Sequence, residues 1–190
     1  PEHILMQLNP EDPRWPRIYR VNVNTARRAV VKNSMVDVVG WTTDQQGRPR
    51  LAYVLDEQKM LEQYLYRTPE GKEWELLWTH PLDDNANFSP VLFDRDDPDV
   101  AWVRSNHEGT TTGLYRYRFS TRTFIEKLFL NPEVDIDSVF LDPWERRVIG
   151  VRYTLAESRV QWFDPEVAAL FNDVRQRIAA RHLYVASWSA

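Results

Sequence analysis

A short motif with an aliphatic residue, a tyrosine and an arginine recurs along the chain at an interval of nearly fifty residues. It occupies Ile18–Arg20, Leu65–Arg67 and Leu114–Arg116, and a weaker aromatic copy lies at Gln161–Phe163. Successive copies are 47, 49 and 47 residues apart. Repeats with a period of 20–50 residues are typical of folds built from one supersecondary unit. The motif therefore predicts a repeated unit of about 48 residues.

The segments between the copies consist of short apolar runs bounded by turn-forming residues, which is the pattern of β-strands. Four short strands in a unit of this length are typical of one β-propeller blade. An immunoglobulin-type sandwich also has short strands, but it does not repeat one motif at a blade-sized interval. The predicted strands are Val36–Thr42, Arg50–Asp56, Leu61–Arg67, Trp74–Trp78, Ser89–Phe93, Val100–Ser105, Gly113–Phe119, Thr123–Phe129, Ser138–Leu141, Arg147–Tyr153 and Arg159–Phe163.

One segment near the end of the chain departs from the strand pattern. Between residues 165 and 180 the apolar residues keep helical spacing. Asp164 suits the N-cap of a helix, Pro165 suits its first position, and Glu166 complements its positive end. Residues 182–188 alternate again like a strand. The sequence thus predicts a helix inserted between two strands of the last unit.

These patterns together predict a mainly β fold, a partial β-propeller with just under four blades of four antiparallel strands and one inserted helix. We interpret residues 1–190 as a fragment of a single propeller domain, with no strand expected before Ile18. Closed propellers have about four to eight blades, and Pro1 replaces the usual Met, so an arc of a longer protein is predicted. Its open strand edges favour self-association. The predicted blades cover residues 17–31 (partial), 36–81, 88–132 and 137–189.

Composition excludes several partners and cofactors. The formal net charge of −4 argues against nucleic acid, since phosphate binding needs a basic surface. No apolar run approaches the ~20 residues that span a bilayer, so no membrane partner is expected. The chain contains no cysteine, which removes thiolate nucleophiles and cysteine metal sites but does not distinguish a cytoplasmic from a periplasmic protein.

No residue is predicted to be catalytic, to bind a cofactor or to bind a metal. No serine lies in the G-x-S-x-G pattern of an α/β-hydrolase, and the four histidines form no ligand pair. His80 and His107 are expected in solvated turns. The acidic run Asp94–Asp99 does not follow the EF-hand pattern and is predicted to be a solvated hairpin loop. The other residues weighed, each with a structural role preferred, are His3, His182, Asp135, Asp137 and Trp144.

Three segments make the chain similar to a known family. They are Gly113–Tyr117, the stretch from Asp135 to Tyr153, and Phe163–Glu166 with the helix that follows it and Ser187–Ser189. In these segments the chain resembles the propeller of the prolyl oligopeptidase family of serine peptidases, especially the dipeptidyl-peptidase and acylaminoacyl-peptidase-like bacterial members.

The resemblance implies a gating role without catalysis by this chain. In that family an α/β-hydrolase domain with a Ser-Asp-His triad follows the propeller, and the propeller caps the active site and limits substrates to peptides. No triad position maps onto this chain, from which the hydrolase domain is absent. The implied partners are the peptide substrate of the parent enzyme and the hydrolase domain of the parent chain. Two alternatives stay open: a stand-alone TolB-like propeller module that binds protein or carbohydrate, and a fragment of a propeller glycosidase.

Overall fold

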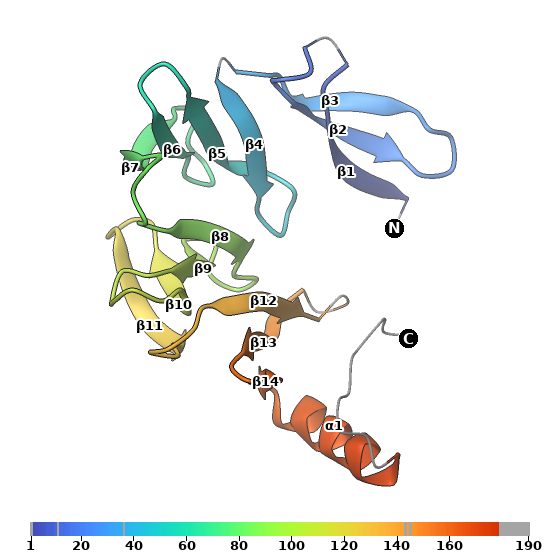
Figure 1. Ribbon diagram of the computed structural model, residues 1–190. Helices are drawn as coiled ribbons and strands as arrows, with labels where there is room; N and C mark the ends of the chain where they lie inside the picture. Colours follow the sequence, from blue (N-terminus) through green and yellow to red (C-terminus); the bar gives the residue numbers. More distant parts are fainter. Residues whose placement is uncertain (1, 11, 36, 143, 145, 179–190) are drawn as a thin grey trace. The chain divides into compact units, whose positions relative to one another are not determined.

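The computed structural model describes residues 2–10, 12–35, 37–142, 144 and 146–178. Within them the fold is mainly β, with four antiparallel sheets and one helix, and neighbours in each sheet are neighbours in sequence (Figure 1). The strands of the first sheet are β1 (His3–Leu8), β2 (Arg17–Asn22) and β3 (Arg28–Lys32). Those of the second are β4 (Val38–Thr43), β5 (Pro49–Asp56), β6 (Leu61–Tyr66) and β7 (Glu75–Pro81). The third sheet contains β8 (Phe88–Phe93), β9 (Val100–Ser105), β10 (Gly113–Arg118) and β11 (Thr123–Phe129), and the fourth contains β12 (Ile136–Leu141), β13 (Val148–Thr154) and β14 (Ser158–Trp162).

The strands predicted in the second, third and fourth sequence repeats are confirmed, with small shifts at their ends. The first sequence repeat was predicted wrongly, because its sheet starts at His3 and not at residue 17. Strand β1 has no alternating pattern, and it is held by six residue pairs with β2, from His3 opposite Asn22 to Leu8 opposite Arg17. The strand predicted at residues 182–188 lies outside the described residues.

The predicted helix is confirmed as α1 (Pro165–Arg177). The Asp164 carboxylate caps it by accepting hydrogen bonds from the backbone N–H groups of Glu166 and Val167, at 2.8 and 3.2 Å. An ion pair with Arg147 and these bonds lower the pKa of Asp164. Phe171 holds the helix on β14 by packing against Trp162, with ring centroids 4.5 Å apart. Within the described residues, no helix has the length and apolar character needed to cross a membrane.

One backbone hydrogen bond recurs in all four sheets. In each sheet, the residue directly after one strand donates its N–H to a carbonyl at or next to the start of the strand that comes before it in the sequence. The donors Val23, Arg67, Phe119 and Phe163 bond to Glu2, Arg50, Asp99 and Ile149, respectively. When the four sheets are matched by this bond, β1, β2 and β3 are equivalent to the second, third and fourth strands of the four-stranded sheets. Strands β12, β13 and β14 are equivalent to the first three.

The aligned bond corrects the register of the sequence repeat. Its donors are spaced by 44, 52 and 44 residues, not by a constant interval near 48. Tyr19 and Tyr115 lie four residues before the bond, whereas Tyr66 and Trp162 lie one residue before it. Because successive side chains alternate between faces, this offset of three residues places the two pairs on opposite faces of their sheets. The motif identifies the equivalent strand in each sheet but not one equivalent position.

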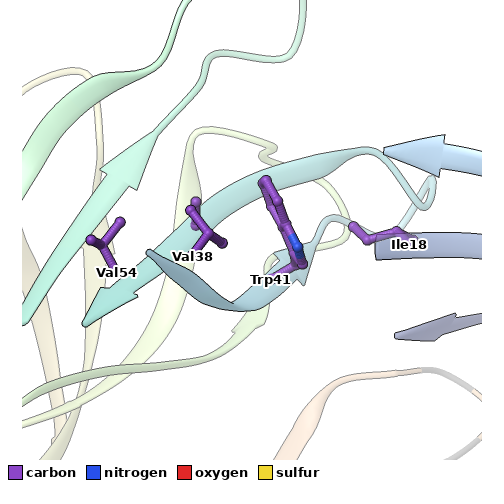
Figure 2. Close-up of a cluster of buried hydrophobic side chains, with 5 residues drawn as sticks. Ile18, Val38, Trp41 and Val54 are labelled. Carbon is purple, nitrogen blue, oxygen red and sulfur yellow. The ribbon is translucent and has the colours of Figure 1, made fainter. Parts of the chain in front are cut away.

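The chain divides into two compact units. The first contains Pro1–Ala86, Asp96–Val100 and Arg118–Thr123, and the second contains Asn87–Arg95, Ala101–Tyr117 and Phe124–Ala190. In the first unit, Trp41 joins the first and second sheets, with its ring between Ile18 and Val38 in Figure 2. The indole N–H of Trp41 donates to the Pro16 carbonyl at 2.9 Å, and the Gln7 side chain bonds both its backbone groups.

The core of the second unit lies between the third and fourth sheets. Its buried centre is apolar, and partly buried aromatic and aliphatic residues surround it. The buried residues are Leu114, Ile136, Val148 and Val151. Phe129 of β11 packs on Tyr153 of β13, with ring centroids 4.9 Å apart. Phe129 and Tyr153 thus pack between the third and fourth sheets.

Candidate functional site

A carboxylate lies between a tyrosine and a histidine side chain on one face of the second sheet. Glu62 accepts a hydrogen bond from the Tyr53 hydroxyl, and its other carboxylate oxygen lies 2.7 Å from Nε2 of His80. Glu62 and His80 are directly opposed on β6 and β7. The Trp78 ring packs against the imidazole with centroids 4.0 Å apart.

The position of His80 differs from the solvated turn predicted from sequence. Its side chain is 7% exposed, because β7 continues through Pro81 instead of ending at Trp78. Burial and the bond to Glu62 raise the pKa of Tyr53, so that its hydroxyl stays a donor to the carboxylate. Burial likewise raises the pKa of the neighbouring Tyr64 to about 12.

Covalent catalysis of the serine type needs a hydroxyl within hydrogen-bonding reach of a base. Among the described residues no serine hydroxyl is bonded to an imidazole. The serine contact of His107 runs through its backbone, whose N–H donates to the Ser105 hydroxyl oxygen at 3.2 Å. Ser120 donates instead to Asp99, at 2.5 Å.

His107 lies in the β9–β10 hairpin, as predicted, but it is not simply solvated. Its ring is stacked on Phe124 with centroids 3.6 Å apart and planes at 4°, and it meets Tyr115 edge-on at 4.3 Å. Burial lowers the pKa of His107, since the charged imidazolium loses hydration among these rings. The aromatic contacts therefore favour the neutral imidazole.

The acidic run that invited a calcium interpretation forms the β8–β9 loop, and arginines neutralise part of it. Arg116 pairs with Asp94 at 3.1 Å, and Arg118 lies 3.0 Å from Asp97 and 3.5 Å from Asp99. The prediction of a hairpin loop is confirmed, while its full solvation is wrong. No group of three acidic or histidine side chains within the described part of the chain could hold a metal ion.

The remaining candidates have local structural contacts. Asp135 accepts from the Thr112 backbone N–H at 2.6 Å, and Asp137 accepts from the Thr154 hydroxyl at 2.8 Å. Trp144 is 54% exposed. His182 lies outside the described residues.

Sequence reasoning missed a hollow of about 320 Å³ on the first sheet, lined by cationic side chains. Arg20 of β2 and His3 of β1 contribute to it from the face that also contains Asn22. Arg20 is directly opposite the small Ala29 of β3. The lining residues are His3, Arg20, Asn22, Thr25, Arg27, Arg28 and Ala29. The adjacent Arg27 and Arg28 were a usable signal, but their convergence with Arg20 depends on the β2–β3 hairpin.

Comparison with known proteins returned neither a matching family model nor a matching curated protein.

Proposed function

We propose that this chain is a non-catalytic β-propeller segment that caps and gates the active site of a parent serine peptidase acting on peptides. The observation that supports the proposal is the recurrent hydrogen bond between equivalent strands of four consecutive antiparallel sheets. Propeller blades are four-stranded sheets of this kind, repeated around a channel. The two four-stranded sheets match one blade each, and the two three-stranded sheets match parts of a blade.

Gly113 provides a physical reason for the motif on which the family resemblance depends. A Cβ atom on this residue would lie 2.6 Å from the Phe129 carbonyl oxygen and 3.0 Å from the Tyr115 ring. Glycine at the start of β10 therefore allows β11 to approach while Tyr115 stays 1% exposed. The Gly-Leu-Tyr sequence is thus a packing requirement of the third sheet, and it supports a role in the scaffold.

The peptidase proposal is tested by the coding sequence downstream of Ala190 and by an activity assay. We expect the reading frame to continue into an α/β pattern with a G-x-S-x-G nucleophile motif. We expect the purified chain to leave aminoacyl and acyl-peptide chromogenic substrates intact. Hydrolysis that persists after repurification, or an unrelated downstream domain, would contradict the proposal.

A stand-alone binding module is the second candidate, because the cationic hollow on the first sheet is an exposed feature with no role in the core. A stop codon directly after Ala190 would favour this candidate over the peptidase. The glycosidase alternative requires two carboxylates that flank a glycosidic bond, at about 5–9.5 Å from each other. No specific pair of described residues favours it.

Self-association is expected from the edge strand β1. One of its edges pairs with β2, and its other edge pairs with no strand among the residues described. Ile4 and Met6 of this strand are 44% and 38% exposed. Unpaired backbone groups next to exposed apolar side chains favour strand pairing between chains.

We therefore expect the mass measured by light scattering to rise with concentration. Met6→Lys should raise the concentration needed for association about tenfold, the equivalent of 1.4 kcal/mol, because charged residues on an edge oppose pairing. Met60→Lys is the matched control, since Met60 is 56% exposed on the β5–β6 turn. A constant monomer mass at high concentration would contradict the prediction.

A further inference from the structure

Three arginines line the cationic hollow, and unlike several other arginines of the fold they have no acidic partner among the described residues. Neither Arg20, Arg27 nor Arg28 forms an ion pair with a carboxylate of the described residues. Elsewhere, Arg50 pairs with Asp44 and Arg177 pairs with Asp173. Glu2 directly precedes His3 in the sequence, but it forms no ion pair with these arginines. Like charges that converge without a counter-charge repel one another, so the hollow favours the binding of an anion.

The hairpin that presents these arginines is held by hydrogen bonds. The Asn22 side-chain oxygen accepts from the backbone N–H groups of Asn24 and Thr25, at 3.0 and 2.9 Å, and from the Thr25 hydroxyl at 3.1 Å. Ala26 adopts a left-handed conformation (φ 55°) and donates its N–H to the Asn22 carbonyl at 2.9 Å. The turn between Arg20 and Arg27 is therefore organised before any ligand arrives, which lowers the entropic cost of binding.

The donors around the hollow suit an oxyanion. Each guanidinium presents N–H groups in a fixed fork that matches two oxygens of a phosphate or carboxylate. Arg20 and Arg27 supply these guanidinium groups, because the Arg28 guanidinium carbon lies 5.3 Å from the Tyr19 ring centroid, on the opposite face of the sheet. The Asn22 amide nitrogen lies 3.5 Å from Nε2 of His3, which places both side chains at the same end of the hollow.

We infer that this hollow binds a small molecule with a doubly charged oxyanion group, a phosphate ester or a dicarboxylate. A dianion balances the charges of the Arg20 and Arg27 guanidinium groups, whereas one carboxylate balances only one. The volume of about 320 Å³ admits such a group. A nucleic-acid backbone is disfavoured, because the chain as a whole carries a net charge of −4 and the cations form one hollow. The inference does not depend on the peptidase proposal.

Titration of the intact chain with inorganic phosphate and with malonate tests the inference. Backbone amides of residues 20–29 and the Arg20 side-chain N–H are followed by NMR at low, constant ionic strength. We expect saturable shifts with a dissociation constant of about 1 mM or tighter for at least one of the two anions. The anion that binds more tightly identifies phosphate or dicarboxylate as the ligand class. Shifts that do not saturate with either anion would overturn the inference.

Arg20→Gln should weaken binding about tenfold or more, which is about 1.4 kcal/mol. Arg122→Gln is the matched control, because it changes the net charge equally at an exposed arginine 3.6 Å from Glu75 and outside the hollow. Equal weakening by the two variants would indicate general electrostatic attraction and would overturn the inference. Tighter binding of a single-stranded oligonucleotide than of either small anion would overturn the assignment to a small ligand.

Discussion

Arg50→Met is expected to lower the free energy of unfolding by about 3–5 kcal/mol, as loss of one partner from a buried ion pair typically does. Arg50 is fully buried, at 0% exposure. Its Nη1 lies 3.3 Å from the Asp44 carboxylate, its Nη2 donates to the Tyr66 hydroxyl at 2.8 Å, and its Nε donates to the Arg67 carbonyl at 2.7 Å. Methionine fills a similar volume but supplies none of these donors, so several polar groups lose a partner inside the fold.

Arg48→Met provides the control for this substitution. Arg48 bonds to the same carboxylate at 2.8 Å, but its side chain is 40% exposed. Exposed ion pairs contribute only about 0–1 kcal/mol, so the loss should be much smaller than for Arg50. Urea denaturation followed by far-UV circular dichroism measures both. Equal losses in the two variants would contradict a special role for the buried arginine.

The cost of Arg50→Met should also depend on pH. Burial favours the neutral form of Asp44, but hydrogen bonds from Arg48 and Arg50 outweigh it and lower the pKa of Asp44. A carboxyl with a lowered folded-state pKa stabilises the fold above its unfolded pKa of about 3.9, and this stabilisation is lost as the pH falls below that value. The stability difference between wild type and Arg50→Met should therefore narrow below about pH 4. A difference that stays constant down to pH 2 would contradict the role assigned to the Asp44 charge.

Trp41→Ala is the second substitution with a large expected effect, about 3–5 kcal/mol. The indole is 6% exposed and meets Trp74 edge-on, with ring centroids 5.5 Å apart. Its removal leaves a cavity among Ile18, Val38 and Val54 (Figure 2). It also deprives the Pro16 carbonyl of its hydrogen bond. The loss of stability therefore includes both the transfer free energy of the indole and the cost of the cavity that it leaves.

Trp144→Ala is the matched control for the tryptophan deletion, because Trp144 is 54% exposed. Substitutions at such surface positions change stability by about 0.5 kcal/mol or less. Trp41→Phe should fall between the two, since it keeps most of the packing but loses the bond to Pro16. Hydrogen exchange of the β4 and β5 amides tests whether the loss of stability lies in the first compact unit. Protection of these amides that is unchanged in Trp41→Ala would show that the indole does not hold the two sheets together.

Several elements were predictable from sequence because their signals are local. A short apolar run between turn-forming residues identified β9 over Val100–Ser105 with its observed bounds. The Asp164-Pro165-Glu166 sequence located the start of α1, because a cap needs only a side-chain oxygen close to the first free N–H groups. The β8–β9 loop was equally local, since a run of aspartates around Pro98 does not form a strand.

Other features were missed because they depend on residues far apart in the sequence. Strand β1 has no strand pattern of its own and exists through its pairing with β2. The environment of His80 depends on Glu62, which lies 18 positions earlier and opposite it across the β6–β7 ladder. The cationic hollow depends on the hairpin that returns Arg27 to the side of Arg20.

The recurrent tyrosine motif shows where the contribution of sequence ends. The sequence by itself determined that the chain forms short antiparallel strands in repeated groups, because apolar alternation and turn residues act over a few positions. Only the tertiary structure decided the register, which places Tyr66 at the end of its strand and Tyr115 three residues before the end of its own. The physical reason is that register is set by hydrogen bonds and side-chain packing between strands. A shift of an odd number of residues reverses the face that a side chain occupies without changing the local pattern.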